Sequence, residues 1–396
     1  MTATPYVRYI AVFKYAFAPL GGDEMRVGKL KNKLLELYES DPQTAVLLLG
    51  APGIGKSETV REVAQEIARR EGKEFIEYSD DVANEILRNP EKYFLLVDFR
   101  LSEVEPADLI GIPRVQEIDN KPYVQYIPLL WARCLQAASG VLFLDEITNV
   151  QRDDVISVAY KLALDRKVGQ VSINGKTFIV AAGNTPEESA LARLLPAPLL
   201  NRFRVYRVDP PSVKDWMNYM DAHYEDWDKR VLAFLLAHEG ENYLIQKPDD
   251  AETLEQFPTP RSWTKLAAVS SKLKGDELYE DAAALVGREV ATKFRAFVET
   301  KVDVDELIRN PDGYYELNLD QKFMLTIQLA QKAAKMGTKN KAWVPLAVKI
   351  LEERGELFIV FARAIPAKNK RAELLTLVRN AAPEAFMRVA EAAFSA

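Results

Sequence analysis

The chain has 396 residues, 48% of them hydrophobic and 28% charged, and its formal net charge is −6. That length allows two or three compact units. The acidic net charge argues against a protein held to DNA mainly by a basic surface, but it does not exclude a local basic pore. One cysteine, Cys134, excludes an internal disulfide, and His223 and His238 lack partners at zinc-ligand spacing. Because no apolar run approaches the roughly 18 residues of a membrane span, we expect no membrane association and a cytoplasmic location.

The N-terminal segment is the one unusual stretch. Residues 4–20 are aromatic and weakly basic, and Arg8 and Lys14 interrupt them, so a signal peptide fits poorly. We expect residues 1–24 to form an N-terminal arm. Alternatively, translation starts at Met25, and Gly21–Glu24 is a translated ribosome-binding site.

The first half of the chain alternates between strand and helix patterns. Residues 45–49 are a continuous apolar run, typical of a strand buried on both faces of a parallel sheet. Apolar residues then recur at helical spacing from Val60 to Ile67, and Gly72 ends that helix. Further apolar strands are predicted at 94–97, 141–144, 178–182 and 203–208. This alternation predicts a three-layer α/β fold with a parallel sheet.

Two hairpins are expected to interrupt this pattern. Residues 115–117 and 123–126 flank Asp119-Asn120, and residues 171–173 and 176–178 flank Asn174-Gly175, a strong hairpin signal. After about residue 210 the strand patterns disappear. The remaining segments look helical, notably 276–302, 321–335, 343–354 and 370–378.

A glycine-rich loop follows the first strand and opens a helix. Its sequence matches the phosphate-binding pattern G-x-x-x-x-G-K-[ST] at every fixed position. Glycines let backbone N–H groups converge on phosphates, Lys56 is expected to reach the terminal phosphates, and Ser57 to ligate Mg²⁺. The alternative, a chance Gly/Pro loop, fits this strand–helix context poorly. The predicted binding residues are Gly50, Pro52, Gly53, Ile54, Gly55, Lys56, Ser57 and Glu58.

Two acids end another predicted strand. Four apolar residues, 141–144, precede Asp145 and Glu146, and ligands of open α/β sheets bind at the carboxyl ends of strands. We expect Asp145 to hold Mg²⁺ and Glu146 to activate the attacking water. Alone, the pair would equally suit a strand that ends in solvated acids.

An amide follows a third strand in the same way. Asn184 comes directly after 178–182 and Gly183, on a strand expected to lie beside the one ending in Asp145. It could hold the water or the terminal phosphate. Gly-Asn-Thr-Pro is also turn chemistry in its own right, so a turn-forming Asn is the alternative.

Taken together, these motifs resemble those of the AAA+ ATPases, specifically the MoxR-like branch with a hairpin inserted in its second helix. The matching stretches cover roughly residues 27–270 in the expected order: GAPGIGKS, VDFRLS at 97–102, DLIGIP at 108–113, VLFLDEI, AAGNT, LLNRF at 199–203 and PTPR at 258–261. The resemblance implies ATP and Mg²⁺ as cofactors. It also implies an α/β ATPase domain at 25–210, a helical lid at 211–275 and a helical C-terminal region at 276–396, after the 1–24 arm.

The resemblance assigns further roles. Asn184 matches the sensor-1 position, Arg202 the arginine finger that reaches the adjacent subunit's nucleotide, and Arg261 the sensor-2 arginine. It equates residues 111–127 with the helix-2 insert and about 168–178 with the hairpin before sensor 1. A finger of this kind is worth about 10³–10⁵ in rate in GTPases. Arg202 and Arg204 alternate on the predicted strand, so an ion-paired or solvated arginine is the competing interpretation. Arg261 could equally have only a structural role, in the first turn of the helix that Thr259-Pro260 begins.

Some features depart from the family pattern. Asn201 stands where many relatives carry an acid, and the long C-terminal region has no signature of a defined partner. The family suggests a hexameric, chaperone-like remodelling ATPase acting with a partner that bears a von Willebrand A-type domain.

Two other functions remain open. The first is a nucleic-acid motor, with Tyr123, Tyr126 and Lys121 of the first hairpin contacting bases and phosphate. This is possible but not favoured, since the insert is not clearly basic. The second is a scaffold that binds ATP and scarcely hydrolyses it, which Glu146 and Arg202 disfavour.

Overall fold

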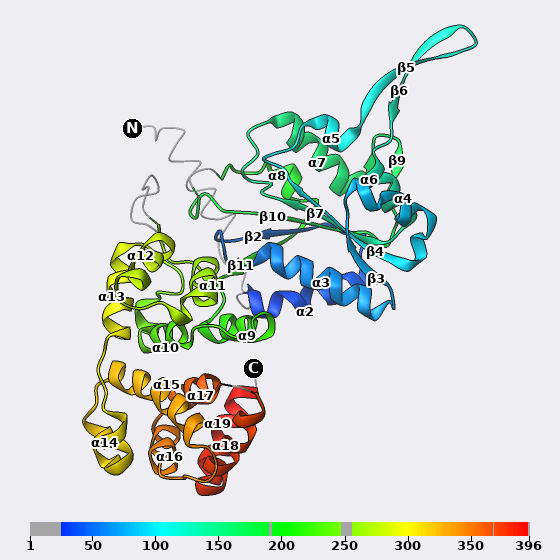
Figure 1. The fold of residues 1–396 in the computed structure, drawn as a ribbon. Helices are drawn as coiled ribbons and strands as arrows, with labels where there is room; N and C mark the ends of the chain where they lie inside the picture. Colours follow the sequence, from blue (N-terminus) through cyan, green and yellow to red (C-terminus); the bar gives the residue numbers. More distant parts are fainter. Residues whose placement is uncertain (1–24, 190–191, 247–255, 367, 395–396) are drawn as a thin grey trace, which may run out of the picture. The chain divides into compact units, whose positions relative to one another are not determined.

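The computed structural model describes residues 25–189, 192–246, 256–366 and 368–394, which form two compact units (Figure 1). The first unit contains the described residues up to Ala51 together with Lys56–Thr185 and Ala192–Asp209. The second contains Pro52–Gly55, the described part of 186–191 and the chain from Pro210 onwards. The predicted N-terminal arm, residues 1–24, lies outside the described residues.

A seven-stranded parallel sheet forms the centre of the first unit, as the strand–helix alternation predicts. Its order is β1-β11-β2-β10-β7-β4-β3, so the strand before the glycine-rich loop lies inside the sheet, between β11 and β10. The strands are β1 (Met25–Arg26), β2 (Val46–Leu49), β3 (Glu74–Glu77), β4 (Tyr93–Arg100), β7 (Gly140–Asp145), β10 (Phe178–Gly183) and β11 (Arg204–Asp209).

Helices cover both faces of this sheet, which gives the predicted three layers (Figure 1). Leu47 and Leu49 of β2 face one core with α4, α6 and α7, while Val46 and Leu48 are buried on the other face, since side chains alternate along a strand. On that other face, the Tyr38 ring of α2 meets the Phe94 and Phe178 rings edge-on. The helices are α2 (Val27–Ser40), α3 (Lys56–Arg70), α4 (Asp80–Arg88), η1 (Pro90–Lys92), α5 (Pro106–Ile110), α6 (Leu130–Ala137), α7 (Asp153–Asp165) and α8 (Ala197–Leu200).

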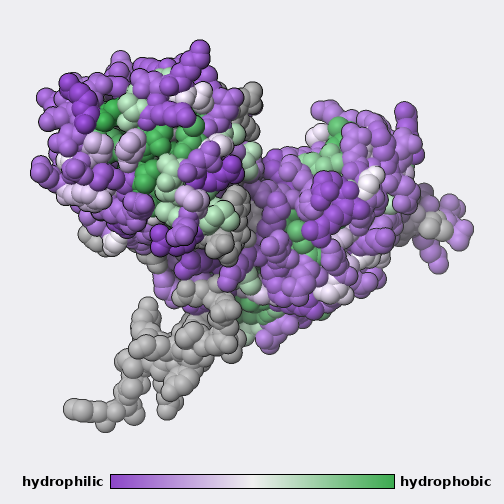
Figure 2. All heavy atoms as spheres, turned by 90° about the horizontal axis from the view of Figure 1, so that it is seen from below, coloured by the Kyte–Doolittle hydropathy of each residue, from purple (hydrophilic) through white to green (hydrophobic). Residues whose placement is uncertain are grey.

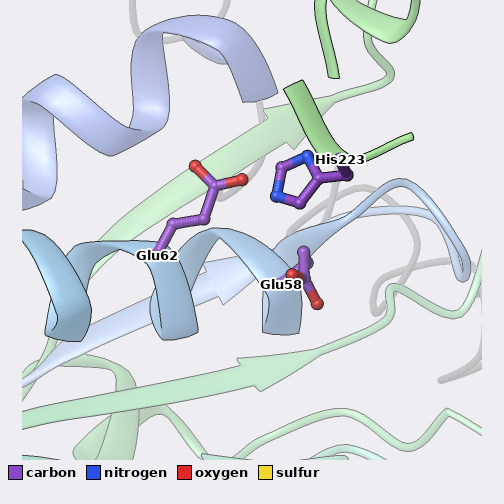
Figure 3. Close-up of side chains that lie close together, drawn as sticks. All are labelled: Glu58, Glu62 and His223. Carbon is purple, nitrogen blue, oxygen red and sulfur yellow. The ribbon is translucent and has the colours of Figure 1, made fainter. Parts of the chain in front are cut away.

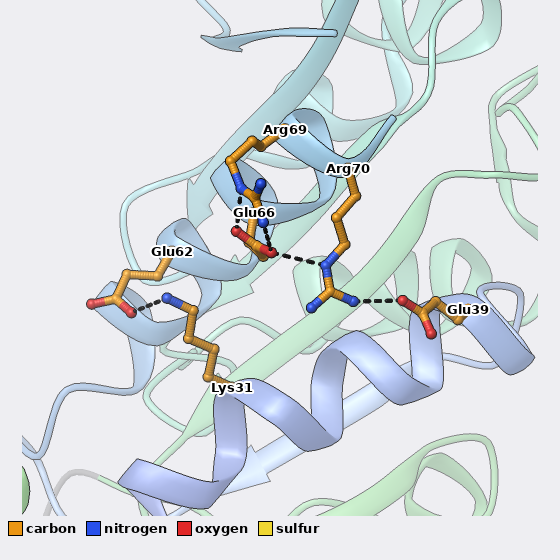
Figure 4. Close-up of polar contacts among 6 residues, drawn as sticks. All are labelled: Lys31, Glu39, Glu62, Glu66, Arg69 and Arg70. Atoms are coloured by element: carbon orange, nitrogen blue, oxygen red, sulfur yellow. Dashed lines mark hydrogen bonds and ion pairs between the residues drawn. The ribbon is translucent and has the colours of Figure 1, made fainter. Parts of the chain in front are cut away.

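Ion pairs connect α2 to α3 at the surface (Figure 4). Lys31 of α2 pairs with Glu62 of α3 at 2.8 Å, and Arg70 of α3 pairs with Glu39 of α2 at 2.6 Å and, within α3, with Glu66 at 2.8 Å. These side chains are 20–62% exposed, and surface pairs of this kind typically contribute below about 1 kcal/mol each. Buried apolar residues therefore account for most of the α2–α3 packing.

The first predicted hairpin is confirmed and projects from the unit (Figure 1). β5 (Ile112–Ile118) pairs antiparallel with β6 (Lys121–Ile127), and Val115 lies opposite Val124. Asp119 and Asn120 both have positive φ, 52° and 57°, as a type I′ turn requires.

The second predicted hairpin is wrong in its pairing. β8 (Lys167–Val168) pairs with β9 (Val171–Ser172) around Gly169, and residues 171–173 do not pair with 176–178. Asn174 instead makes an isolated turn, accepting the Thr177 N–H on its carbonyl and the Lys176 N–H on its side chain, both at 2.9 Å. The reason is that Phe178 begins the central strand β10, whose neighbours β2 and β7 take its backbone hydrogen bonds.

The second unit is helical in its described residues beyond 210. Its core holds Trp227, Trp263 and Trp343, all buried. The predicted 276–302 helix is two helices, because Gly287 has φ +86° and an added Cβ would lie 2.3 Å from the Gln256 carbonyl oxygen. The helices are α9 (Val213–His223), α10 (Lys229–Ala237), η2 (Glu239–Glu241), α11 (Pro260–Val269), η3 (Ser270–Lys272), α12 (Gly275–Val286), α13 (Arg288–Val298), α14 (Val304–Arg309), η4 (Pro311–Glu316), α15 (Leu319–Met336), α16 (Val344–Glu353), α17 (Gly355–Ala364), α18 (Lys368–Ala381) and α19 (Pro383–Phe394). The lid boundary at residue 275 stays a prediction.

Hydrophilic residues predominate on the surface shown in Figure 2, and apolar residues gather there in limited patches. Within the described ranges, no helix has both the length and the apolar character needed to cross a membrane.

Candidate functional site

Three neighbouring strands end at the same edge of the sheet and carry the predicted polar residues there. β2 leads into the glycine-rich loop, β10 lies beside β2 and ends at Gly183, and β7 lies beside β10 and ends at Asp145. The predicted adjacency of the strands that lead to Asn184 and Asp145 is therefore confirmed. Parallel strands place their carboxyl ends together, which is why residues about 130 positions apart converge.

The loop between β2 and α3 depends on its glycines. Gly53 has φ +75° and Gly55 has φ +102°, backbone conformations that residues other than glycine rarely adopt. The loop starts where the Gly50 N–H donates to the Gly183 carbonyl at 3.3 Å, and α3 begins at Lys56. The N-terminal, positive end of the α3 dipole therefore lies at this loop, where it favours an anion.

Lys56 is 7% exposed, and its ammonium group lies at the centre of the loop. It donates to the carbonyl oxygens of Gly50 at 2.7 Å and Ala51 at 2.8 Å, and to Asn184 Oδ1 at 3.2 Å. A buried ammonium needs several such acceptors, because an isolated charge away from water is very costly. The lysine therefore connects the glycine-rich loop with the end of β10.

Ser57 and Asp145 are in direct contact. The Ser57 hydroxyl donates to Asp145 Oδ2 at 2.7 Å, and the Glu146 N–H donates to Asp145 Oδ1 at 2.8 Å. A hydroxyl and a carboxylate side by side are the hard oxygen donors that Mg²⁺ prefers. The residues present therefore fit a magnesium ion.

Glu146 has an unusual backbone. Its φ is +58°, a left-handed conformation that non-glycine residues adopt at a cost of about 1–3 kcal/mol and that clusters at functional sites. Its Oε2 accepts the Ser102 hydroxyl at 2.5 Å, from the turn after β4. Both the backbone and the carboxylate of Glu146 are thus held by specific contacts.

Asn184 is oriented by Thr148. The Asn184 N–H donates to Thr148 Oγ1 at 2.8 Å, and Gly183 permits this approach, since an added Cβ would lie 2.6 Å from a Thr148 methyl carbon. The Asn184 side chain then meets Lys56, as described above. Asn184 consequently does more than form a turn.

Asp98 is an acid at this edge that the sequence argument passed over. On β4 it lies opposite Phe143, two positions before the Arg100–Asp145 pair, so all four face the same side of the sheet. Although Asp98 retains solvent exposure, partial desolvation raises the pKa of its carboxyl to about 6, and the Asp145 charge adds to the shift. Arg61 and Arg100 oppose it.

A raised pKa makes a pH-dependence testable. In the folded protein Asp98 holds its proton up to about pH 6, whereas the unfolded chain releases it near pH 4. The raised pKa of Asp98 therefore lowers the free energy of unfolding as the pH rises from about 4 to 6, and above about pH 6 the full loss is present. We expect Asp98→Asn to gain stability relative to the native protein as pH rises through that window, in thermal melts without metal or nucleotide. A difference that stays constant between pH 4 and 8 would contradict the shift.

Arg202 and Arg204 have different environments. The Arg204 guanidinium on β11 forms an ion pair with Asp41 at 2.9 Å, and the Arg204 backbone N–H donates to the Ala45 carbonyl. Arg202 is half-buried in the turn before β11, and its guanidinium carbon lies 5.7 Å from the Tyr160 ring centroid. Arg204 is therefore an ion-paired arginine.

Arg261 is the second residue of α11, where Thr259 makes a capping box with Ser262 and Pro260 takes the first helical position. Residues Pro52–Gly55 belong to the same compact unit. An added Cβ on Gly53 would lie 3.4 Å from Thr259 and 3.6 Å from the Arg261 Cβ. The start of α11 is therefore close to this part of the loop. Thr259 and Pro260 begin the helix, as the sequence predicts.

Glu58 and Glu62 lie one turn apart on α3 (Figure 3). Glu62 accepts Lys31, as described above. His223, also labelled in that figure, ends α9 and stacks on the Tyr219 ring at 4.2 Å. His238 Nδ1 lies 3.1 Å from the Phe234 carbonyl, within the helical unit.

Sequence reasoning assigned no role to Ser102, Thr148 or Asp98. Asp98 and Ser102 lie inside the 97–102 stretch, and Thr148 follows the two acids by two residues, so proximity to the motifs was the available signal. Their contacts depend on how β4, β7 and β10 align, which no single segment specifies.

Comparisons with known proteins agree with this geometry. Residues 46–209 match the model of the ATPase family associated with various cellular activities (AAA). No curated protein is similar enough in sequence to match the chain.

Solved structures share only a distant likeness. Cdc6p from Pyrobaculum aerophilum is 13% identical, with 95% of this chain and 97% of that chain covered and a TM-score of 0.38. ADP-bound NtrX from Brucella abortus is 14% identical, with 97% and 73% covered and a TM-score of 0.35. DnaA from Aquifex aeolicus with AMPPCP is 14% identical, with 92% and 89% covered and a TM-score of 0.32. Likeness at this level says nothing about what this chain binds.

Proposed function

We propose that this ATP hydrolase, whose residues 46–209 match the AAA model, is a MoxR-like remodelling ATPase that acts as an oligomeric ring. The observation that carries the proposal is the convergence of Lys56, Asn184, Ser57 and Asp145 at the ends of three adjacent strands.

Each residue of the site has a proposed task. The loop Gly50–Ser57 and Lys56 bind the phosphates of ATP, with Glu58 in the first turn of the following helix. Ser57 and Asp145 hold Mg²⁺, which, when bound, neutralises charge developing on the phosphoryl oxygens. Glu146 accepts the proton of the attacking water, and Asn184 orients that water or the terminal phosphate.

Arg202 is proposed as the finger supplied to the neighbouring subunit, and Arg261 as a sensor of the bound nucleotide. The position of Arg202 in the turn directly before β11, which matches the LLNRF stretch, supports this choice. A finger shared between subunits makes hydrolysis depend on assembly, and a hexamer is the proposed assembly.

The β5–β6 hairpin is proposed as the surface that engages a partner protein. Val115 and Val124 face each other on one side of it and are 67% and 58% exposed. Its charged residues balance, since Arg114 and Lys121 accompany Glu117 and Asp119. Exposed apolar residues without net positive charge suit a protein surface better than a phosphate backbone. A protein with a von Willebrand A-type domain, proposed from the family resemblance, is one such partner.

The alternative of a nucleic-acid motor rests on Tyr123, Tyr126 and Lys121. The Tyr123 hydroxyl donates to Gln116 Oε1 at 2.9 Å within the hairpin, which gives that tyrosine a structural role. The following experiment separates the two functions.

Affinity capture tests the partner class. Glu146→Gln protein is used as bait with ATP and Mg²⁺, because it is expected to bind ATP without releasing it through hydrolysis. We expect the bait to capture a protein partner. When Val115→Asp and Val124→Asp are added to the bait, we expect about tenfold less of that partner to be recovered.

The matched control places the same two charges on the opposite face, as Gln116→Asp and Gln125→Asp, and retains the partner. Capture of nuclease-sensitive polynucleotide in place of a protein would contradict the remodelling proposal and favour the motor.

A further inference from the structure

The guanidinium of Arg202 lies against an aromatic ring of its own subunit. Its carbon is 5.7 Å from the centroid of Tyr160, within the roughly 6 Å range of a cation–π interaction. Tyr160 comes from α7, more than 40 positions earlier in the chain. Sequence analysis gave this tyrosine no role.

Tyr160 is well placed to hold another side chain. On α7, its neighbours Ala159 and Leu162 are buried in the core beneath the sheet, and Tyr160 itself is half-buried against that core. Leu200 packs against the same core from the segment that carries Arg202. The ring is therefore anchored on a rigid helix and retains some solvent exposure.

The backbone of Arg202 is also fixed. The Phe203 N–H donates to the Leu200 carbonyl at 3.2 Å, and the Phe203 side chain is buried in the core. One residue further, the Arg204 N–H donates to the Ala45 carbonyl at 2.9 Å. The position of the Arg202 Cα is thus set by its neighbours, and the Tyr160 ring contacts the end of its side chain.

The same segment is attached to α7 a second time. Arg193 pairs with Asp153, the first residue of α7, at 2.8 Å, and its guanidinium donates to the Val150 and Gln151 carbonyls at 3.2 Å. Tyr160 contacts the segment about two turns further along the helix. The strand-to-helix loop after Glu146 and the segment bearing Arg202 thus share one helix as their support.

We propose that Tyr160 is a positioning residue for Arg202, holding its guanidinium in a restricted orientation for the terminal phosphate bound in the adjacent subunit. The inference rests on the proposed role of Arg202 between subunits. An arginine side chain loses much rotamer freedom when it is ordered, so ordering it beforehand speeds the step in which it must be in place. The effect should fall on kcat and leave the KM for ATP nearly unchanged, because Tyr160 does not act on ATP binding.

The test compares aromatic and aliphatic replacements. Tyr160→Phe keeps the ring and is expected to stay within about 2-fold of the native kcat, whereas Tyr160→Leu is expected to lose about 2- to 30-fold. Tyr160→Met replaces the ring with a flexible aliphatic chain and should lose as much kcat as Tyr160→Leu. It is the substitute if the leucine variant does not fold. Equal losses in Tyr160→Phe and Tyr160→Leu would overturn the inference.

Tyr315→Leu is the matched control. The Lys349 ammonium lies 4.6 Å from the Tyr315 ring centroid in the helical unit, so this variant removes a cation–aromatic contact of the same kind. We expect its kcat to equal that of the native protein. A loss equal to that of Tyr160→Leu would show a general effect of destabilisation and would also overturn the inference.

Mixed assemblies distinguish this inference from the function on which it rests. Glu146→Gln subunits lack the water-activating carboxylate but carry an intact Tyr160 and Arg202. Adding them to Tyr160→Leu subunits, or to Arg202→Ala subunits, should raise turnover per intact site towards the native value. The double variant Tyr160→Leu/Arg202→Ala should be no slower than Arg202→Ala, because both changes affect one group.

Each outcome has one meaning. Rescue of both variants supports the inference. Rescue of Arg202→Ala but not of Tyr160→Leu overturns the role of Tyr160 and leaves the proposed function standing. No rescue of Arg202→Ala at any mixing ratio contradicts the finger between subunits, and the role of Tyr160 falls with it.

Discussion

Glu146→Gln should bind ATP with nearly native affinity and hydrolyse it about 10²- to 10⁴-fold more slowly, the range expected for loss of a general base. Glutamine is almost the same size, and its amide oxygen can still accept the Ser102 hydroxyl that Glu146 Oε2 accepts at 2.5 Å. It cannot take a proton from water. The geometry of the site is thus retained while its basic group is removed.

The measurement pairs phosphate release with binding of a fluorescent ATP analogue. Glu103→Gln is the control, because Glu103 is an exposed acid of the same turn as Ser102 and pairs only loosely with Arg100, at 3.5 Å. It should hydrolyse ATP at the native rate. Turnover of Glu146→Gln within about 3-fold of native would remove Glu146 from its proposed task.

Lys56→Ala should weaken ATP binding by about 10- to 150-fold, as loss of a charge-assisted hydrogen bond to phosphate implies. The ammonium is 7% exposed and is already desolvated, so phosphate oxygens compete for it with the Gly50 and Ala51 carbonyls and not mainly with water. Alanine leaves the left-handed glycines of the loop in place. The loss should therefore appear in affinity before it appears in folding.

Titration with a fluorescent ATP analogue measures the affinity, and thermal melting without nucleotide checks the fold. Lys33→Ala is the matched control, since Lys33 is a surface residue of α2 that pairs with Glu36 at 3.1 Å. ATP affinity equal to that of the control would contradict the assignment of Lys56.

The core strands could be predicted because they are continuous apolar runs. β2, β7 and β10 are buried along nearly their whole length, and such segments indicate strands in a covered parallel sheet without any knowledge of their neighbours. β3, with the sequence Glu-Phe-Ile-Glu, was missed because it is a short edge strand with exposed acids at both ends. Local pattern says little about such a strand, since it is stabilised by its pairing with β4.

Turn signals were reliable only where no stronger partner competed. Asp119-Asn120 closes a hairpin whose strands have no other sheet to join. Asn174-Gly175 has the stronger hairpin sequence, yet Phe178 joins the central sheet, and the turn is all that remains of the prediction. Tertiary pairing overrode local propensity at that point.

The sequence by itself determined the phosphate loop, the two acids after a buried strand and the alternating fold, because each depends on residues close together in the chain. Only the tertiary structure decided which of two neighbouring arginines is engaged by Asp41, which hydroxyl holds Glu146 and which ring lies under Arg202. Those contacts join residues 42 to 163 positions apart, and the alignment of separate strands and helices brings them together. No segment contains that alignment, so no local pattern could reveal it.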